Sequence, residues 1–137
     1  MAHEKFRAEV LTPDGEVFND EVEMVSTRTA VGSIGILAHH QPLLAMLNPT
    51  ELRLYKSDSE IVRFAQSEGY LQMAENRALI LVEEAHESDE LDAGELRDRV
   101  ADAEKRRDDA GEDSERRRVA ERDLKRWEMF LRIAEGS

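Results

Sequence analysis

The residues of this chain best suited to bind a metal ion or move a proton are its four histidines. His39 and His40 are adjacent, so on a strand their side chains would point to opposite faces and could not easily share one ion. His3 and His86 lie far away in the sequence, and no HExxH or HxH spacing occurs. We therefore predict that the chain has no metal site.

Motifs for nucleophilic catalysis and phosphate binding are also missing. Ser33 and Ser67 do not lie in a GxSxG sequence, and no Gly-Lys-Ser/Thr follows Gly32 and Gly35 as a P-loop requires. The chain has no cysteine, so thiolate chemistry and disulfides are excluded. Carboxylates are abundant but scattered. We expect no catalytic residue and no cofactor.

The overall charge limits the kinds of partner. A net charge of -12 argues against nucleic acid, because phosphate binding needs a basic surface, and against electrostatic docking on anionic lipid. No apolar run approaches the ~18 residues of a membrane span, so no direct membrane span is expected. The first ten residues resemble neither a signal peptide nor a transit peptide, which favours a cytoplasmic protein.

Residues 6–84 have the pattern of short strands separated by turns. Apolar residues alternate with polar ones, and turn signals occur at Pro13-Asp14-Gly15, at residues 57–60 and at Glu75-Asn76. A turn signal roughly every 8–12 residues indicates an all-β sandwich or barrel. We therefore predict an antiparallel β-sandwich over residues 1–87, followed by a different kind of domain.

From about Leu91 the apolar residues follow the period of a helix. Asp89 or Asp92 can cap a first helix, Gly111 can end it, and Ser114 can cap a second. Two apolar seams step by three and four residues, and they consist of Ala93, Leu96, Val100, Ala103, Arg107 and Ala110, and of Ala120, Leu124, Trp127, Leu131 and Ala134. The pattern predicts an antiparallel α-helical hairpin over residues 88–137, and hence an α+β fold class for the whole chain.

The predicted hairpin has few large apolar residues of its own. Four or five line its seam, at roughly 1.5–3 kcal/mol each. Ordering about 40 residues costs on the order of 1–2 kcal/mol per residue, which backbone hydrogen bonds offset only in part. We therefore expect this hairpin to depend on docking against another surface, and to be able to undock.

Basic residues cluster in the second half, where residues 87–137 hold 17 acidic and 12 basic side chains. One interpretation is a solvated helical face stabilised by ion pairs between neighbouring turns. The other interpretation is a surface that meets an acidic protein partner. The candidate contact residues surround the hairpin tip and follow the second helix: Arg106, Arg107, Arg116, Arg117, Arg118 and Arg122.

The stretch from Gly32 to Leu47 is the one long, mostly uncharged segment of a chain in which 36% of residues are charged. Residues 32–44, GSIGILAHHQPLL, resemble the signature G-E-x-G-I-L-P-G-H-x-P-L-L of the epsilon subunit of bacterial F-type ATP synthase. Residues 68–82, EGYLQMAENRALILV, resemble a second segment of that family, G-G-F-x-E-V-x-x-N-x-V-x-V-L. Residues 6–25 are similar to its first strands. The resemblance covers essentially the whole chain at matching spacing.

This resemblance implies a non-catalytic rotor subunit in the central stalk of a proton-translocating ATP synthase. It implies that the sandwich binds the gamma subunit and rests on the membrane-embedded c-ring. It implies that the hairpin lies against the sandwich or extends toward the catalytic alpha and beta subunits, where it restrains ATP hydrolysis. Such a subunit is peripheral at the cytoplasmic face of the bacterial inner membrane. The implied interface residues are Gly32, Ser33, Gly35, His39 and His40, and the basic residues named above would meet beta.

The chain departs from the family pattern in the first of these segments. Ala38-His39 replaces the family's Pro-Gly before His40, so the geometry of that loop is expected to differ. Ser33 stands where an acidic residue often follows the first glycine, which weakens the case for a charged contact with the c-ring.

An ATP-sensing module is the alternative function that the resemblance implies. Some family members bind ATP at the hairpin through an I/L-D-x-x-R-A motif. Here Leu91 and Asp92 match its start, and Arg97 lies nearby, but Glu95 replaces the motif's arginine. Because a glutamate repels phosphate, we expect ATP binding to be weak or absent.

Overall fold

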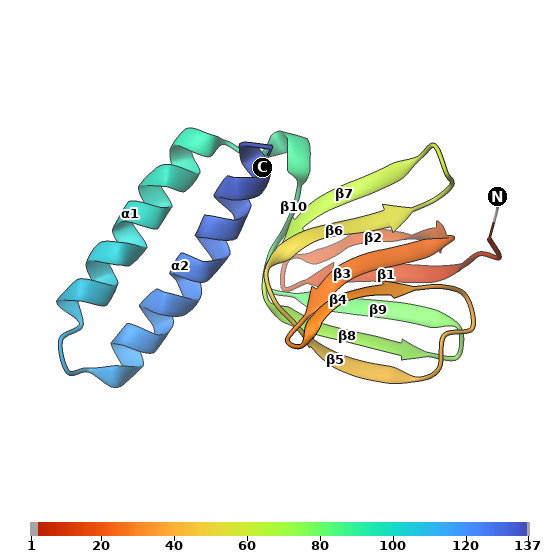
Figure 1. Ribbon diagram of the computed structural model, residues 1–137, viewed down its shortest axis with the longest axis horizontal. Coiled ribbons are helices and arrows are strands. Elements are labelled where there is room, and N and C mark those ends of the chain that lie inside the picture. Colours follow the sequence, from red (N-terminus) through yellow and green to blue (C-terminus); the bar gives the residue numbers. More distant parts are fainter. Residues whose placement is uncertain (1–2, 137) are drawn as a thin grey trace. The chain divides into compact units, whose positions relative to one another are not determined.

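The structure is a computed structural model that describes residues 3–136. The chain divides into two compact units, residues 1–87 and residues 88–137. The first unit is built of strands and the second of helices (Figure 1).

Ten strands are described in the first unit. Short turns join β1 to β2, β6 to β7 and β8 to β9, at the three positions where the sequence showed turn signals. The strands are β1 (Phe6–Thr12), β2 (Gly15–Val22), β3 (Met24–Thr29), β4 (Gly32–Ile36), β5 (Leu43–Leu47), β6 (Thr50–Tyr55), β7 (Ile61–Gln66), β8 (Gly69–Ala74), β9 (Arg77–Val82) and β10 (Ala85–Glu87).

The strands form two layers of a sandwich. They pair in the order β10-β7-β6-β3-β5-β8-β9-β1-β2, and β4 pairs with β3. Strands β3 and β5 share only the pair Thr29 and Leu47, so the sheet folds over at this point into the two layers. The α+β fold class with an N-terminal sandwich is confirmed. One pairing, β1 with β9, is parallel, whereas the others are antiparallel.

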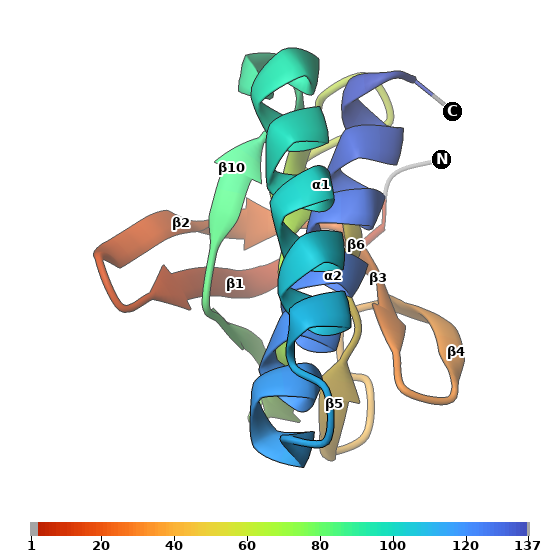
Figure 2. The ribbon, with the colours of Figure 1, turned by 90° about the vertical axis from the view of Figure 1, so that its left-hand side faces the viewer.

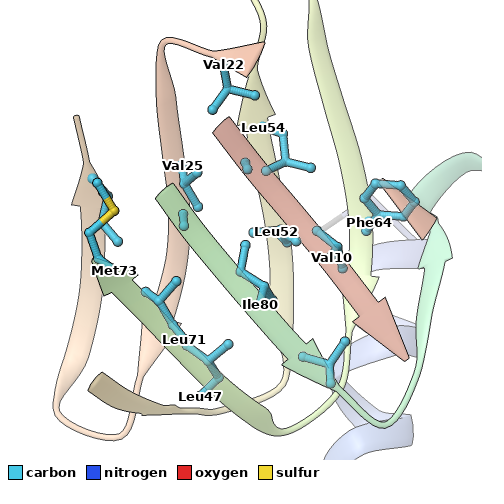
Figure 3. Packing of buried hydrophobic residues seen from close by; sticks show 14 of the residues in the cluster. Val10, Val22, Val25, Leu47, Leu52, Leu54, Phe64, Leu71, Met73 and Ile80 are labelled. Atoms are coloured by element: carbon cyan, nitrogen blue, oxygen red, sulfur yellow. The ribbon is translucent and has the colours of Figure 1, made fainter. Parts of the chain in front are cut away.

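The core lies between the layers and follows the two-residue alternation of the strands. Val10, Leu71 and Ile80 of one layer face Val25 and Leu52 of the other (Figure 3). These side chains are fully removed from solvent.

Strand β5 corrects one expectation. An apolar run such as residues 42–47 is expected to pack into the core, but only Leu47 of this run is buried. Leu44 and Met46 are 73% and 61% exposed. The reason is that β5 covers the core with one face only, so alternate residues of its apolar run point outward.

The second unit is a helical hairpin, in which a short turn η1 (Ser88–Glu90) precedes α1 (Ala93–Asp109) and α2 (Ser114–Ala134). The two helices lie antiparallel and side by side (Figures 1 and 2). Asp92 caps α1 by accepting a hydrogen bond from the Glu95 N–H at 3.2 Å. Gly111 follows α1 with φ of 57°. Among the described residues, no helix combines the length and the apolar character needed to cross a membrane.

The cap of α2 differs from the prediction by one residue. Asp113, not Ser114, is the N-cap, and its carboxylate accepts from the Arg116 N–H at 3.0 Å. Both residue types are good caps, so the sequence alone did not separate them.

The prediction of the residues in the hairpin seam left out part of the buried face. Leu96, Ala103 and Leu124 are buried as expected, but Phe130 is fully buried too and had not been assigned to the seam. It meets the edge of the half-buried Trp127 ring at 5.7 Å between centroids. Arg126, four residues before Phe130, is also buried and lies over the Trp127 ring. Helix α2 therefore buries a wider face than a single heptad seam provides.

Candidate interaction surfaces

An exposed row of apolar side chains crosses the outer face of one layer of the sandwich. Met46, Tyr70, Leu81 and Leu11 stand opposite one another on β5, β8, β9 and β1, which are neighbouring strands (Figure 1). Met46, Tyr70 and Leu81 are 61%, 51% and 43% exposed. We call these four residues the apolar row. Contiguous apolar surface of this kind usually marks a place where another protein binds.

The polarity of this face increases along the strands away from the apolar row. The next cross-strand row is mixed, and it consists of Leu44, Gln72, Leu79 and Glu9. The row beyond it is basic and consists of Ala74, Arg77 and Arg7, with Arg77 paired to Glu9. The face thus offers a partner an apolar end and a charged end, which would fix the orientation of docking.

Sequence reasoning missed this face. The runs LLAML at 43–47 and ALILV at 78–82 are apolar at every position, and they read as buried strands. In an antiparallel sandwich the core covers only one face of each strand. The sequence therefore did contain a signal of an exposed apolar face, namely the apolar residues at the outward positions Leu44, Met46, Leu79 and Leu81.

The loop between β4 and β5 places the two histidines at one end of the sandwich. His39 has φ of 64°, in the left-handed region, and its N–H donates to the Asn76 side chain at 2.7 Å. Its ring lies 2.9 Å from the Glu4 carboxylate. The loop therefore lies beside the β8–β9 turn (Figure 1) and contacts Glu4. His39 stands where the family signature has a glycine, and it adopts the left-handed conformation that glycine adopts without strain.

Replacing His39 with glycine is expected to raise the free energy of unfolding by about 1 kcal/mol, because a non-glycine residue with positive φ is strained by about 1–2 kcal/mol. The lost contact with Glu4 is exposed and contributes little. Urea unfolding followed by circular dichroism measures the change. His40→Gly is the matched control, since His40 has no positive φ and should lose stability. Equal effects of the two substitutions would contradict the assignment of strain to His39.

The other residues of the predicted interface do not cluster with the histidines. Gly32 and Ser33 begin β4, while His39 and His40 follow its other end. Gly32 has φ of 138° and ends the β3–β4 turn, in which the Thr29 hydroxyl donates to the Gly32 carbonyl at 2.9 Å. Among the described strands β4 pairs with β3 alone, so these residues and Gly35 lie on an edge strand.

Most of the basic residues on the hairpin are engaged within it. Arg106 binds Asp102 of its own helix and Asp123 of α2, at 3.0 and 3.1 Å. Arg107 pairs with Asp108, Arg118 with Glu115, and Arg122 with Asp123. Arg117 donates to the Gly111 carbonyl at the end of α1. Arg116 is exposed and its side chain makes no ion pair or hydrogen bond within residues 3–136.

The electrostatics of the hairpin agree with these contacts. Partial burial alone would lower the pKa of Arg106, but hydrogen bonds to Asp102 and Asp123 outweigh it and raise that pKa above its ordinary value. The Arg118 guanidinium lowers the pKa of Glu115, first through hydrogen bonds and then through its charge. Both pairs therefore stay ionised at neutral pH, and Arg106 holds α1 to α2.

The residues of the possible nucleotide site have other contacts. Asp92 caps α1, and Arg97 forms an ion pair at 3.2 Å with Glu135, the C-cap residue of α2. Leu91 is half-buried beside the cap. ATP binding at Leu91, Asp92 and Arg97 remains a prediction, and it would have to compete with these contacts. Within residues 3–136, no three His, Cys, Asp or Glu side chains are placed to hold a metal ion.

Solved structures share this fold. A chain of the mitochondrial ATP synthase of Euglena gracilis, in a cryo-EM structure of its OSCP/F1/c-ring part, superposes with a TM-score of 0.77 at 20% identity. The match covers 94% of this chain and 81% of that one. A chain from the central stalk and c-ring of Tetrahymena thermophila mitochondrial ATP synthase gives a TM-score of 0.52 at 19% identity, covering 71% and 73%. At such identities these likenesses show the fold alone.

Sequence comparisons show the family. The family model for the β-sandwich domain of the ATP synthase delta/epsilon chain matches residues 5–88. The ATP synthase epsilon chain of Sulfurihydrogenibium sp. (strain YO3AOP1) is 32% identical over 129 residues, which cover 94% of this chain and 96% of that protein. The epsilon chain of Priestia megaterium is 41% identical over 105 residues, covering 76% and 77%. This chain therefore belongs to the epsilon-chain family of ATP synthase.

Proposed function

We propose that this chain is a non-catalytic rotor subunit of the central stalk of a bacterial F-type ATP synthase, and that it couples c-ring rotation to the catalytic head. The observation that carries the proposal is the apolar row on the outer face of β5, β8, β9 and β1. The increase in polarity along the strands away from this row suits a partner that docks in one fixed orientation. Membership of the epsilon family supports the gamma subunit as that partner.

A second surface of the sandwich meets the c-ring in this proposal. The loop with His39 and His40 lies at an end of the strands, whereas the apolar row lies on a sheet face. The c-ring could therefore bind the end of the sandwich while gamma binds the sheet face, as a subunit located between gamma and the ring requires. The edge of β4, with Gly32, Ser33 and Gly35, would add a second contact, separate from the histidine loop. Such a subunit is peripheral, at the cytoplasmic face of the bacterial inner membrane.

The hairpin restrains ATP hydrolysis by meeting the catalytic alpha and beta subunits. It is a compact unit of its own, held by the interhelical pairs Arg106–Asp123 and Arg97–Glu135. Such internal links allow two helices to move as one body. Arg116 is the candidate residue for contacting an acidic surface of beta, because it is exposed and makes no ion pair within residues 3–136.

Deleting residues 88–137 is expected to raise the ATPase activity of the assembled enzyme on the order of fivefold, the lower end of usual coupling between sites. The cut falls at the boundary between the two units and leaves β10 in place, so gamma binding should persist. Steady-state hydrolysis assays of complexes with the full and shortened chains measure the effect. Arg116→Ala should release part of the restraint. Unchanged hydrolysis with intact assembly would mean that the hairpin does not inhibit.

Co-elution with gamma tests the proposed function as a whole. Mixed with the gamma subunit of the same organism, the chain should elute from a sizing column as a stable one-to-one complex. A chain that elutes alone, although folded by circular dichroism, would overturn the proposal.

A further inference from the structure

The layer that contains β3, β4, β6 and β7 has a basic outer face, although the whole chain has a net charge of -12 (Figure 1). Arg28 on β3, Arg53 on β6 and Arg63 on β7 are all exposed. Both neighbours of Arg28 along its strand, Thr27 and Thr29, are buried, so the alternation of the strand places Arg28 on the outer side. We call the three arginines the basic patch. It lies on the layer opposite the one that carries the apolar row.

The charges of the basic patch are only partly balanced within the chain. Arg53 binds Glu51 of its own strand at 2.9 Å. The side chains of Arg28 and Arg63 make no ion pair or hydrogen bond within residues 3–136. Arg53 and Arg63 also stand directly opposite each other on neighbouring antiparallel strands, where two like charges destabilise a sheet. An anionic partner would remove this unfavourable interaction.

The basic patch reaches the edge strand β4 through Arg28. Arg28 stands directly opposite Ser33 in the register of β3 with β4. The family signature has a glutamate at position 33, and a glutamate there would face Arg28 across the two strands. The serine of this chain is uncharged and exposed, so Arg28 is left available to pair with another molecule. Ser33 and Gly35 are small, which lets a partner that lies along β4 come close to the patch.

The chemistry and the place of the basic patch limit its partner. A guanidinium donates two parallel hydrogen bonds to a carboxylate in one plane, so exposed arginines suit an acidic protein surface. Gamma is proposed to bind the outer face of the other layer and would leave this face free. The edge of β4 is proposed to contact the c-ring, and the patch is continuous with that edge through Arg28. This continuity favours the ring over gamma.

We infer that the basic patch binds an acidic surface of the c-ring, with Arg28 as the contact nearest to β4. The inference rests on the proposed function, since it takes the ring to lie along β4. It adds the sign of the charge at this contact. The chain presents a cation where the family signature presents an anion, so the ring must supply a carboxylate.

Binding of the complex of this chain with gamma to purified, detergent-solubilised c-ring tests the inference, with biolayer interferometry as the readout. Arg28→Gln should weaken binding about tenfold, the effect of losing one charge-assisted hydrogen bond. Arg28→Glu should weaken it further, because it places two carboxylates against each other. Raising salt from roughly 50 to 500 mM should weaken the wild type more than Arg28→Gln, because screening removes what the substitution has already removed.

The matched control is Arg116→Glu. It makes the same change of charge as Arg28→Glu, at another exposed arginine without an ion pair within residues 3–136. Arg116 lies on the hairpin, and the assay contains no beta subunit, so this variant should bind the ring like the wild type. Equal losses in Arg116→Glu and Arg28→Glu would show an effect of net charge alone and would overturn the inference.

Two further outcomes would also overturn it. If the wild type binds vesicles of phosphatidylglycerol without the ring, and Arg28→Glu does not, the partner is lipid and the inference is wrong. If Arg28→Glu and the double variant with Arg63→Glu both bind the ring like the wild type, the inference is wrong while the proposed function stands. If the wild-type complex does not bind the ring, the proposed function fails at the c-ring contact, and the inference fails with it.

Discussion

Leu81→Glu is expected to lower the affinity for gamma by at least about a hundredfold while leaving the sandwich folded. Leu81 lies in the apolar row between Tyr70 and Leu11, so binding would bury the new carboxylate against apolar groups. A buried charge without a partner is among the most costly changes at an interface. In the free chain position 81 is 43% exposed, and a glutamate there stays in contact with water.

The matched control for this prediction is Val31→Glu. Val31 is also apolar and is 98% exposed, but it lies in the β3–β4 turn, outside the apolar row. Calorimetry should show that it binds gamma like the wild type, and urea unfolding should give similar midpoints for both variants. Equal affinities of Leu81→Glu and the wild type would contradict the assignment of this face to gamma.

Gly69→Ala is expected to lower the free energy of unfolding by about 3 kcal/mol or more. A Cβ atom at position 69 would lie 2.0 Å from the Leu81 carbonyl oxygen and 2.8 Å from the Val82 Cα atom. Both are backbone atoms, so no side chain can turn aside, and strands β8 and β9 would have to separate. The close approach of the two backbones explains why the strand begins with glycine.

Gly35→Ala is the matched control for this steric effect. Gly35 is also a strand glycine, but a Cβ atom there would meet only the Met24 sulfur, at an ordinary 3.7 Å. Urea unfolding followed by circular dichroism should place Gly35→Ala within about 0.5 kcal/mol of the wild type. If Gly69→Ala also unfolds at the wild-type midpoint, the backbones do not approach as closely as described.

Local features of the fold were predictable because they depend on neighbouring residues. The turn at Glu75-Asn76 has both residues in the left-handed region, as a two-residue hairpin needs. Asp92 and Gly111 mark the ends of α1 as expected. The parallel pairing of β1 with β9 joins residues about 70 positions apart, as Arg7 with Arg77, and no local pattern announces it.

The face proposed to bind gamma was not predictable in the same way. The run ALILV has the same apolar character at each position, yet Ile80 is buried and Leu81 is exposed. Which positions face outward depends on what covers each side of the strand, and sequence patterns do not show it.

The histidine loop, in contrast, was recognisable from the sequence as an unusual segment. Ala38-His39 replaces the family's Pro-Gly in this loop, so a different loop geometry was expected. The structure shows instead that His39 has the left-handed backbone conformation that suits a glycine.

A photo-cross-link in the assembled enzyme tests the central claim most directly. The chain has no cysteine, so Gln72→Cys creates a unique thiol in the middle of the proposed gamma face, between Leu44 and Leu79. Arg53→Cys places the same thiol at an exposed position of β6, in the other layer. With benzophenone maleimide attached, position 72 should cross-link to gamma in high yield, and position 53 should not. Cross-linking of gamma from position 53 but not from position 72 would contradict the account.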